Sequence, residues 1–433
     1  MKDLSKHCII GLLLLTSSVA LTGCPDQDPD PTDNNLTNNE PAGPKEELDC
    51  QTACTALAAC DQGLELSCLT DFQQTCVAQC EQDGSVAGFA QVSCDTVALY
   101  ADGALGLEGT CAQVNACTPD ASDYAPGADD TWDACVSDGG TYERFEPSIS
   151  SAGRVAGFEE IADLLWRKTQ APSGADFLAA REIYAAGEGL DSRVQRREDE
   201  HYPAVVEDGQ TLRCRDEGVP AKDPNRCVGP AQIRPILNQA FADGIEGKDP
   251  WVNAAKIEAA LTWFLYVSTH KEAITCTVKK KDCDSAYAYY TGDKPRSEGI
   301  GLAGIFKRQV PQAHERVWDG ILAVRCWRDL DGEEEATDLA LRARAVDQMD
   351  RALLYGLYQL VGQRTAQALA YEENQRRAAL AWLEIMVPVL DRSATQIDAT
   401  RAATLRTQFS TYTPTPTLTE DALDNLASFY ACP

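Results

Sequence analysis

Apolar residues in the C-terminal part of the chain recur at the spacing of helices rather than of strands. In one clear case, Phe177, Ala180 and Tyr184 fall on one helical face. Ser173 precedes them as an N-terminal cap, and Gly187 follows as a typical stop. Sustained alternation of apolar and polar residues, the pattern of half-buried strands, does not occur. The pattern therefore predicts helices and no substantial sheet.

The same spacing predicts a series of helices along the C-terminal part. Pro250 suits the first turn of a long helix, and Pro311 should break another. The expected ranges are 173–186, 230–241, 251–274, 300–327 with the break at 311, 336–390 holding two or more helices, 394–409 and 420–430. The predicted fold class is all-α: a helical bundle domain over 155–433, preceded by a small disulfide-rich α-hairpin module. The stretch 118–154, rich in Asp, Gly, Ser and Pro, is expected to be a linker or long loop.

Residues 48–140 are expected to form the disulfide-rich helical module. Two pairs of cysteines in it are separated by three residues, which places both members of a pair on one helical face. The surrounding segments are rich in Ala, Leu and Gln, which suit helices. Two antiparallel helices would then be joined by Cys50–Cys80 and Cys54–Cys76, with Cys60–Cys68 closing the turn. No connectivity follows for Cys94, Cys111, Cys117 and Cys135.

The N-terminal segment has the layout of a bacterial lipoprotein signal. Lys2 and Lys6 precede an apolar run over 9–21, and small residues then lead to Cys24. Residues 1–23 are therefore expected to be removed as a signal peptide and Cys24 to carry lipid, palmitate included, as a membrane anchor. The alternative is an ordinary secretory signal that happens to end in Cys. Residues 24–47, rich in Pro, Asp, Asn and Thr, would be a disordered tether.

The charge balance narrows the range of partners. The 433 residues include 67 acidic and 38 basic ones, for a net charge of −29. Nucleic acid needs Lys and Arg for its phosphates, so this balance argues against a nucleic-acid partner. No second segment has the roughly 18 apolar residues that a membrane span needs. The expected membrane contact is therefore the lipid anchor, and the expected location is the bacterial cell envelope, at the outer membrane or cell surface.

The cysteines indicate an oxidising compartment. The chain has 18 of them, and those left after Cys8 and Cys24 fall into two even groups, within 50–135 and within 214–432. Each group can close its disulfides internally, so the exported protein is expected to be fully oxidised. The expected pairs in the second group are Cys214–Cys227, Cys276–Cys283 and Cys326–Cys432. Zinc is the alternative, although finger-type Cys and His spacings do not occur.

Each histidine of the mature chain has carboxylate neighbours, and all of them lie in the helical domain. Imidazole and carboxylate side chains in a helical bundle are ligands of iron or manganese. The candidate metal ligands are His201, Glu200, His270, Glu272, Asp284 and His314. Asp284 is the expected partner of His270, because a Cys276–Cys283 bridge would fold the chain back toward it. The alternative is that these histidines are surface groups, which are common beside acids on an acidic protein.

Recognisable catalytic motifs are absent from the sequence. Paired Glu-x-x-His, His-Glu-x-x-His, Gly-x-Ser-x-Gly and the P-loop pattern do not occur. Residues 329–332 suggest a calcium loop, but its Gly is at the fourth position instead of the sixth. Since every mature cysteine is expected to be bonded, no nucleophile and base can be nominated. The sequence therefore predicts that the protein is not an enzyme.

The run 284–292, Asp-Ser-Ala-Tyr-Ala-Tyr-Tyr-Thr-Gly, resembles the Trp-Asp-Glu-Ala-x-Ala-Phe-Tyr-Thr-Gly stretch of the algal iron-assimilation family of secreted helical proteins. The segment 180–187, Ala-Arg-x-Ile-Tyr-x-x-Gly, is similar to that family's opening helix. The resemblance covers residues 173–328 and implies iron as a cofactor. Ser285 stands where the pattern has Glu, and Cys283 where it has Trp. Imelysin-like periplasmic proteins, also helical and linked to iron, are a more distant resemblance, and their Gly-x-His-x-x-Glu signature does not occur.

Two functions of different classes follow from these features. The first is an envelope lipoprotein whose helical domain binds iron or another metal ion for capture or uptake. The second is a non-catalytic interaction or envelope-structural lipoprotein with no metal site, whose partner would be an envelope protein. A groove lined by Trp251, Trp263, Tyr287 and Tyr289 would favour a small-molecule or peptide partner. Convergence of His201, His270 and Asp284 would separate the two functions.

Overall fold

The computed structural model describes residues 120–127, 131–168, 170–186, 189–370, 373–410, 426 and 429. The chain divides into two compact units, and all of these residues belong to the second, which comprises 104–106 and 116–433. The predicted signal peptide, the tether, Cys24 and the predicted hairpin disulfides lie outside the described residues. Within the described residues the fold is all-α, as predicted, and its only strands form one short hairpin.

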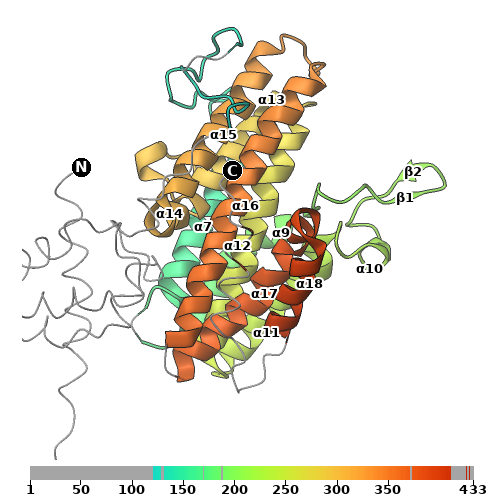
Figure 1. Ribbon diagram of the computed structural model, residues 1–433. Coiled ribbons are helices and arrows are strands. Elements are labelled where there is room, and N and C mark those ends of the chain that lie inside the picture. The colour runs from blue at the N-terminus through green and yellow to red at the C-terminus, as the bar shows by residue number, and fades with distance from the viewer. Residues whose placement is uncertain are drawn as a thin grey trace, which may run out of the picture. The chain divides into compact units, whose positions relative to one another are not determined.

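The described residues form twelve α-helices (Figure 1). They are α7 (Ser150–Leu165), α8 (Gly174–Ala185), α9 (Leu190–Val194), α10 (Val219–Lys222), α11 (Arg234–Ile245), α12 (Pro250–Thr275), α13 (Lys280–Thr291), α14 (Leu302–Gln309), α15 (Pro311–Leu330), α16 (Leu339–Ala370), α17 (Glu373–Ile397) and α18 (Ala399–Ser410). A π-helical turn, η3 (Gly229–Ile233), precedes α11, and a 3-10 turn, η4 (Arg296–Glu298), precedes α14. Strands β1 (Val206–Glu207) and β2 (Gln210–Thr211) pair antiparallel and are exposed.

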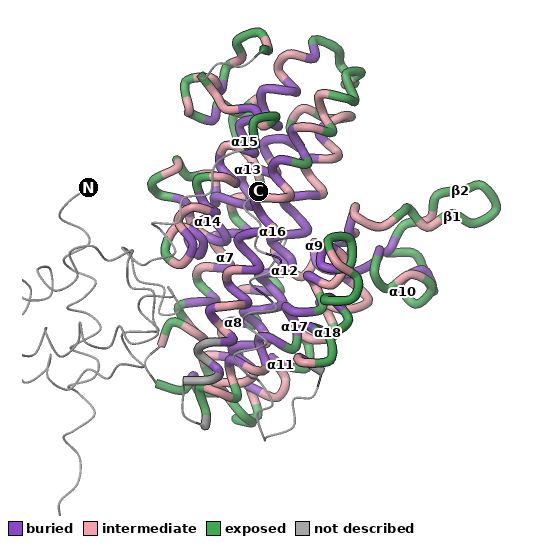
Figure 2. Tube along the Cα trace, in the orientation of Figure 1, coloured by how far each residue is buried: buried purple, intermediate pink, exposed green. Residues whose placement is uncertain are grey.

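Helix α12 forms the centre of the bundle, where it packs against α11, α13, α16 and α17. Every residue from Ile257 to His270 is buried, which is expected of a helix that is apolar on all sides. Figure 2 shows this burial along the long helices and contrasts it with the exposed hairpin β1–β2. Polar groups that sit within this stretch therefore lie in the core, and His270 is one of them.

Local sequence signals place several helix ends where they were predicted. Ser173 and Asp176 form a reciprocal capping box at the start of α8. Pro250 occupies the first turn of α12, and Pro311 separates α14 from α15. The predicted helix over 420–430 lies almost wholly outside the described residues. Helix α13, which carries the run 284–292, was not predicted.

Two predicted disulfides are present, and one prediction is wrong. Cys214–Cys227 and Cys276–Cys283 are both formed, each closing a short loop. Cys326 is bonded to Cys135, with 5.3 Å between the Cα atoms, rather than to Cys432. The assumption that each group of cysteines closes internally therefore fails.

The segment before α7 explains this pairing, because it packs against the bundle instead of bridging as a free linker. Tyr124 donates its backbone N–H to the side chain of Gln348 on α16 at 3.0 Å. Tyr142 donates its hydroxyl to Asp284 on α13 at 3.0 Å. These contacts hold the intervening loop, and with it Cys135, beside α15.

Candidate metal centre

Three elements meet at a buried cluster of ionisable side chains. His201 comes from the loop after α9, and Tyr266 and His270 come from successive turns of α12. Asp350 comes from α16, which packs against α12. Tyr266 and His270 share one face of α12 because residues four apart on a helix are neighbours. Asp199 completes the cluster from the same loop as His201.

His201 lies between two carboxylates. Its Nδ1 is 2.6 Å from Oδ1 of Asp199, and its Nε2 is 2.9 Å from Oδ2 of Asp350. Tyr266 donates its hydroxyl to the other oxygen of Asp350 at 3.1 Å. The His201 side chain is 6% exposed. The ring is therefore fixed at both nitrogens, inside the protein.

His270 stacks directly on His201. The ring centroids are 3.7 Å apart and the planes differ by 7°. Nδ1 of His270 is buried and makes no hydrogen bond to the protein. One ligand atom each from Asp199, His201 and His270 lie within 4.8 Å of one another. A buried imidazole nitrogen without a partner, beside a second imidazole and a carboxylate, is the geometry of a position that a ligand can fill.

A second ion network holds the loop that carries His201. Arg226 is 6% exposed and donates from Nη1 to the backbone carbonyls of Asp199 and Tyr202. Its Nη2 contacts the carboxylates of Glu198 and Glu200, both at 2.8 Å. The Cys214–Cys227 bridge fixes the chain next to Arg226. The Arg226 guanidinium therefore fixes the conformation of the loop that carries His201.

The two stacked imidazoles have opposite pKa shifts. Burial alone would lower the pKa of His201, but the charge of Asp350 and hydrogen bonds to Asp199 and Asp350 raise it to about 9. Burial lowers the pKa of His270 to about 4 in spite of the charge of Asp350. Burial would raise the pKa of Asp350, but the charge of His201 holds it well below its ordinary value. Near neutral pH His201 is therefore a positively charged imidazolium, and His270 is a neutral imidazole.

This donor set fits a first-row transition metal. Two imidazoles with a carboxylate are nitrogen and oxygen ligands that suit iron, manganese and zinc. His270 is already neutral, as a ligand must be, whereas His201 must release its proton. The rings lie in nearly parallel planes, so one ring has to turn for both to bind the same ion. The residues that would hold it are Asp199, His201 and His270, whose ligand atoms converge, while Asp350 contacts His201.

The other predicted metal ligands do not join this cluster. Glu200 is paired with Arg226, and Glu272 is paired with Arg197 at 2.9 Å. His314 accepts or donates at Nδ1 to Tyr290 and at Nε2 to the carbonyl of Arg296. Each of these side chains has a structural partner instead.

The prediction that Asp284 is the partner of His270 is wrong. Helix α13 directs its carboxylate toward the segment before α7, where it accepts from the hydroxyl of Tyr142 and the backbone N–H groups of Phe145 and Glu146. Asp284 is completely buried there. Buried backbone N–H groups need acceptors, and the Asp284 carboxylate accepts from both N–H groups of this turn.

The sequence interpretation did not nominate Asp350, Tyr266 or Asp199 as ligands. Asp350 had one usable signal: it falls at helical spacing between Val346 and Leu353, which are both buried. A carboxylate at a core-facing position of a helix needs a partner. That partner, His201, is 149 residues away in the sequence, so no local pattern could identify it.

A second grouping of possible ligands comprises Cys135, Asp138 and Cys326. Both of its sulfur atoms belong to the disulfide Cys135–Cys326. A disulfide sulfur is not the thiolate that binds metals. This grouping is therefore a structural bridge.

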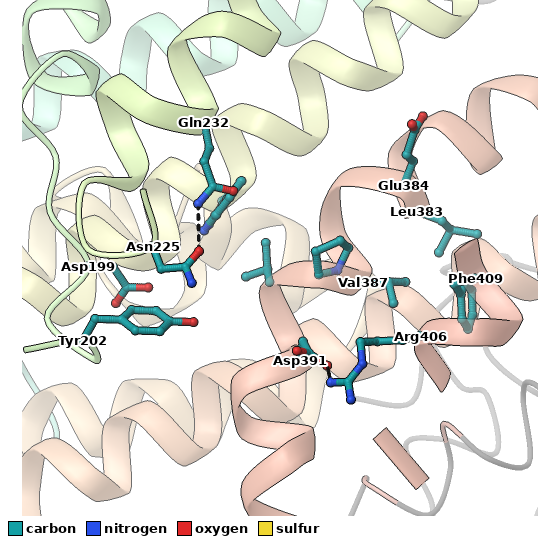
Figure 3. Close-up of a pocket in the computed structure, with 13 residues that line it drawn as sticks. Asp199, Tyr202, Asn225, Gln232, Leu383, Glu384, Val387, Asp391, Arg406 and Phe409 are labelled. Atoms are coloured by element: carbon teal, nitrogen blue, oxygen red, sulfur yellow. Dashed lines mark hydrogen bonds and ion pairs between the residues drawn. The ribbon is translucent and has the colours of Figure 1, made fainter. Parts of the chain in front are cut away.

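A cavity of about 580 Å³ adjoins the cluster of His201, His270 and Asp199 through Asp199 (Figure 3). Its walls also include Trp263 of α12, Val387 and Pro388 of α17, and Phe409 of α18. Of the four aromatic residues considered for a groove, Trp263 lines this cavity and Tyr287 lines a different one. The Asp199 carboxylate of the buried cluster is therefore reached from this cavity.

Comparison with known proteins does not extend this picture. No family model matches the chain, and no curated protein or solved structure shows significant similarity to it.

Proposed function

We propose that this protein is an envelope lipoprotein whose helical domain binds iron, or a related first-row metal ion, for capture or uptake. The observation that carries the proposal is the buried Nδ1 of His270, which has no hydrogen-bond partner. The ring of His270 stacks on that of His201, with 3.7 Å between the ring centroids. The leader ending at Cys24 supports export and lipid anchoring. No helix among the described residues is long and apolar enough to cross a membrane.

The chemistry of the ligands favours a metal of intermediate hardness. All six described cysteines are in disulfides, so soft thiolate ligands are not offered by this part of the chain. Imidazole with carboxylate suits iron, manganese and zinc. Asp199 and Asp350 face His201, and Arg392 lies 3.8 Å from Asp350. A divalent cation bound here would take the place of the acidic proton of His201.

A second function remains as an alternative, because one observation favours it. His201 already satisfies both carboxylates as an imidazolium, without any metal. In that case the cluster is a structural ion network, and the protein is a non-catalytic interaction or envelope-structural lipoprotein. The two functions differ in the role of His270, which the ion network does not use.

Calorimetric titration of ferrous iron into the mature chain, made soluble by Cys24→Ser, tests the metal site. We expect saturable binding that His270→Ala weakens by about 10–100-fold, since loss of a ligand costs at least as much as loss of a supporting contact. His314→Ala is the matched control, because it also removes a buried imidazole with a pKa lowered to about 4. Absent binding, or equal binding by both variants, would establish the alternative.

The lipid anchor is tested separately in cells. Cys24→Ala removes the only thiol that the leader offers at the expected cleavage site. We expect the variant to lose acyl labelling and to leave the membrane fraction. A variant that is labelled and sediments like the wild type would refute the lipoprotein assignment and leave the metal site unaffected.

A further inference from the structure

The cavity beside the metal cluster has the size and lining of a small-molecule site. Its volume of about 580 Å³ falls in the range of about 300–1,000 Å³ that ligand pockets occupy. Trp263, Leu383, Val387 and Phe409 supply apolar surface. In Figure 3, Tyr202 and Asp199 lie on one side and helix α17 on the other. This space is far larger than a single metal ion requires.

The cavity is lined by the polar side chains of Tyr202, Asn225 and Gln232 and by several charged ones. Asp199, Glu384 and Asp391 contribute carboxylates, and Arg406 is the only basic residue among the described lining residues. Arg406 is ion-paired with Asp391, and Asp199 is paired with His201, so the charges of these two carboxylates are compensated. Glu384, which is exposed, is the remaining carboxylate of the described lining. Its charge favours a cationic occupant over an anionic one.

Pro388 adds a backbone acceptor to the same wall. It lies inside helix α17, where a proline has no N–H to give to the carbonyl four residues earlier. That carbonyl belongs to Glu384, which also lines the cavity. Its oxygen is therefore left without its helical partner at the place where the ligand space begins. A donor from a bound molecule can satisfy it.

We infer that this cavity binds a small organic ammonium ion, with an apolar or aromatic body and N–H donors at its charged end. The body would occupy the surface formed by Trp263, Val387 and Phe409. The ammonium group would donate to the Glu384 carbonyl freed by Pro388 and to the Glu384 carboxylate. Aromatic side chains also attract such cations through their ring faces. This inference does not depend on a metal bound at His270.

Binding of 2-phenylethylammonium to the full mature Cys24→Ser chain, with a chelator present to remove metal ions, tests the inference. The neutral 2-phenylethanol and the anionic phenylacetate have similar apolar bodies and serve as comparison probes. We expect saturable one-to-one binding of the ammonium, at least about ten-fold tighter than that of the alcohol, because charged hydrogen bonds discriminate strongly. Equal affinity for alcohol and ammonium, or no saturable binding at millimolar concentration, would overturn it.

Two substitutions locate the site, and one of them excludes unfolding as an explanation. Pro388→Ala restores the helical hydrogen bond of Glu384, so it should stabilise α17 while weakening ammonium binding about five- to ten-fold. Val387→Trp should fill the cavity and abolish binding. Glu182→Gln, an exposed acid on α8, is the control and should bind normally. Full binding by Val387→Trp or by Pro388→Ala would place the ligand elsewhere and overturn the assignment.

His270→Ala separates this site from the metal centre. The variant loses the proposed metal ligand but no residue that lines the cavity. We expect it to bind 2-phenylethylammonium as the wild type does. A loss of ammonium binding in His270→Ala would contradict an independent cavity site, whatever the outcome of the iron titration.

Discussion

At the scale of single residues, the stacked pair His201 and His270 shows how position alone separates two identical side chains. The two rings stack on each other, yet only His201 has carboxylates at both nitrogens. Coulombic attraction keeps His201 charged, while burial without a carboxylate hydrogen bond keeps His270 neutral. His201 therefore stabilises the fold through its ion pairs, and His270 keeps a ring nitrogen without a hydrogen-bond partner.

The raised pKa of His201 gives a pH dependence with a definite sign. Its folded value of about 9 lies above its ordinary value of 6.5, so the stabilisation is fully present below pH 6.5 and is lost as the pH rises through 9. We expect the free energy of unfolding to fall by about 3 kcal/mol over that window. Urea unfolding at successive pH values measures it.

Asp350→Asn is the matched variant for this measurement. It removes the charge that holds the proton of His201, so the loss of stability between pH 6.5 and 9 should become much smaller. If the wild type and Asp350→Asn show the same slope in this window, then the two side chains are not coupled as the geometry requires.

The candidate site could be predicted from the sequence only in part. His201 and His270 stand out because histidine is rare in this chain, with four in all, and because acids flank them. Neighbours in sequence did not become neighbours in space, however: Glu200 and Glu272 turn to Arg226 and Arg197. The carboxylate that does contact His201, Asp350, lies on a helix far along the chain. Local patterns report residue type, whereas convergence depends on helix packing.

At the scale of elements, helices with an apolar face or a clear cap were predictable, and irregular ones were not. The capping box of α8 and the prolines at α12 and α15 set ends that depend on local chemistry alone. Helix α13 begins with lysine and aspartate residues, which give no apolar face to predict it from. It becomes helical because its later residues, Tyr287 to Thr291, are buried against the bundle.

The conformation of the loop that carries His201 depends on the hydrogen bonds and ion pairs of Arg226. Arg226→Ala would leave Glu198 and Glu200 without their cation and the carbonyls of Asp199 and Tyr202 without donors. We expect a loss of about 3 kcal/mol in the free energy of unfolding, typical of breaking a buried ion pair from one side. Chemical denaturation measures this, and metal titration should also show weaker binding.

Lys222→Ala provides the comparison for that prediction. Lys222 is paired with Glu207 at 2.8 Å, but both side chains are more than half exposed. An exposed pair contributes little, so this variant should unfold almost as the wild type does. Comparable losses in the two variants would mean that the Arg226 network does not set the loop.

At the scale of the whole molecule, the sequence predicted the fold class but not how the segment before α7 joins the bundle. Composition rich in Asp, Gly and Ser over 118–154 is typical of a linker. The structure instead anchors this segment through single residues, such as Tyr124 at α16 and Tyr142 at α13. Such contacts depend on where the helices stand in space. The same limitation made the partner of Cys326 unpredictable. An even number of cysteines shows that all of them can pair, but not which ones lie close together.

The Cys135–Cys326 bridge should therefore be the most consequential described disulfide for stability. It links residues 191 apart, whereas the other two described bridges span 13 and 7. A bridge that closes a longer loop restricts the unfolded chain more. We expect Cys135→Ser with Cys326→Ser to lower the free energy of unfolding by about 2–5 kcal/mol. Removing Cys276–Cys283 in the same way should cost less, because its loop is short. Denaturant unfolding of the two double variants compares them, and peptide mapping of the wild type should recover Cys135 joined to Cys326. Recovery of Cys326 joined to Cys432, or a larger loss from the short bridge, would contradict the placement of this segment on the bundle.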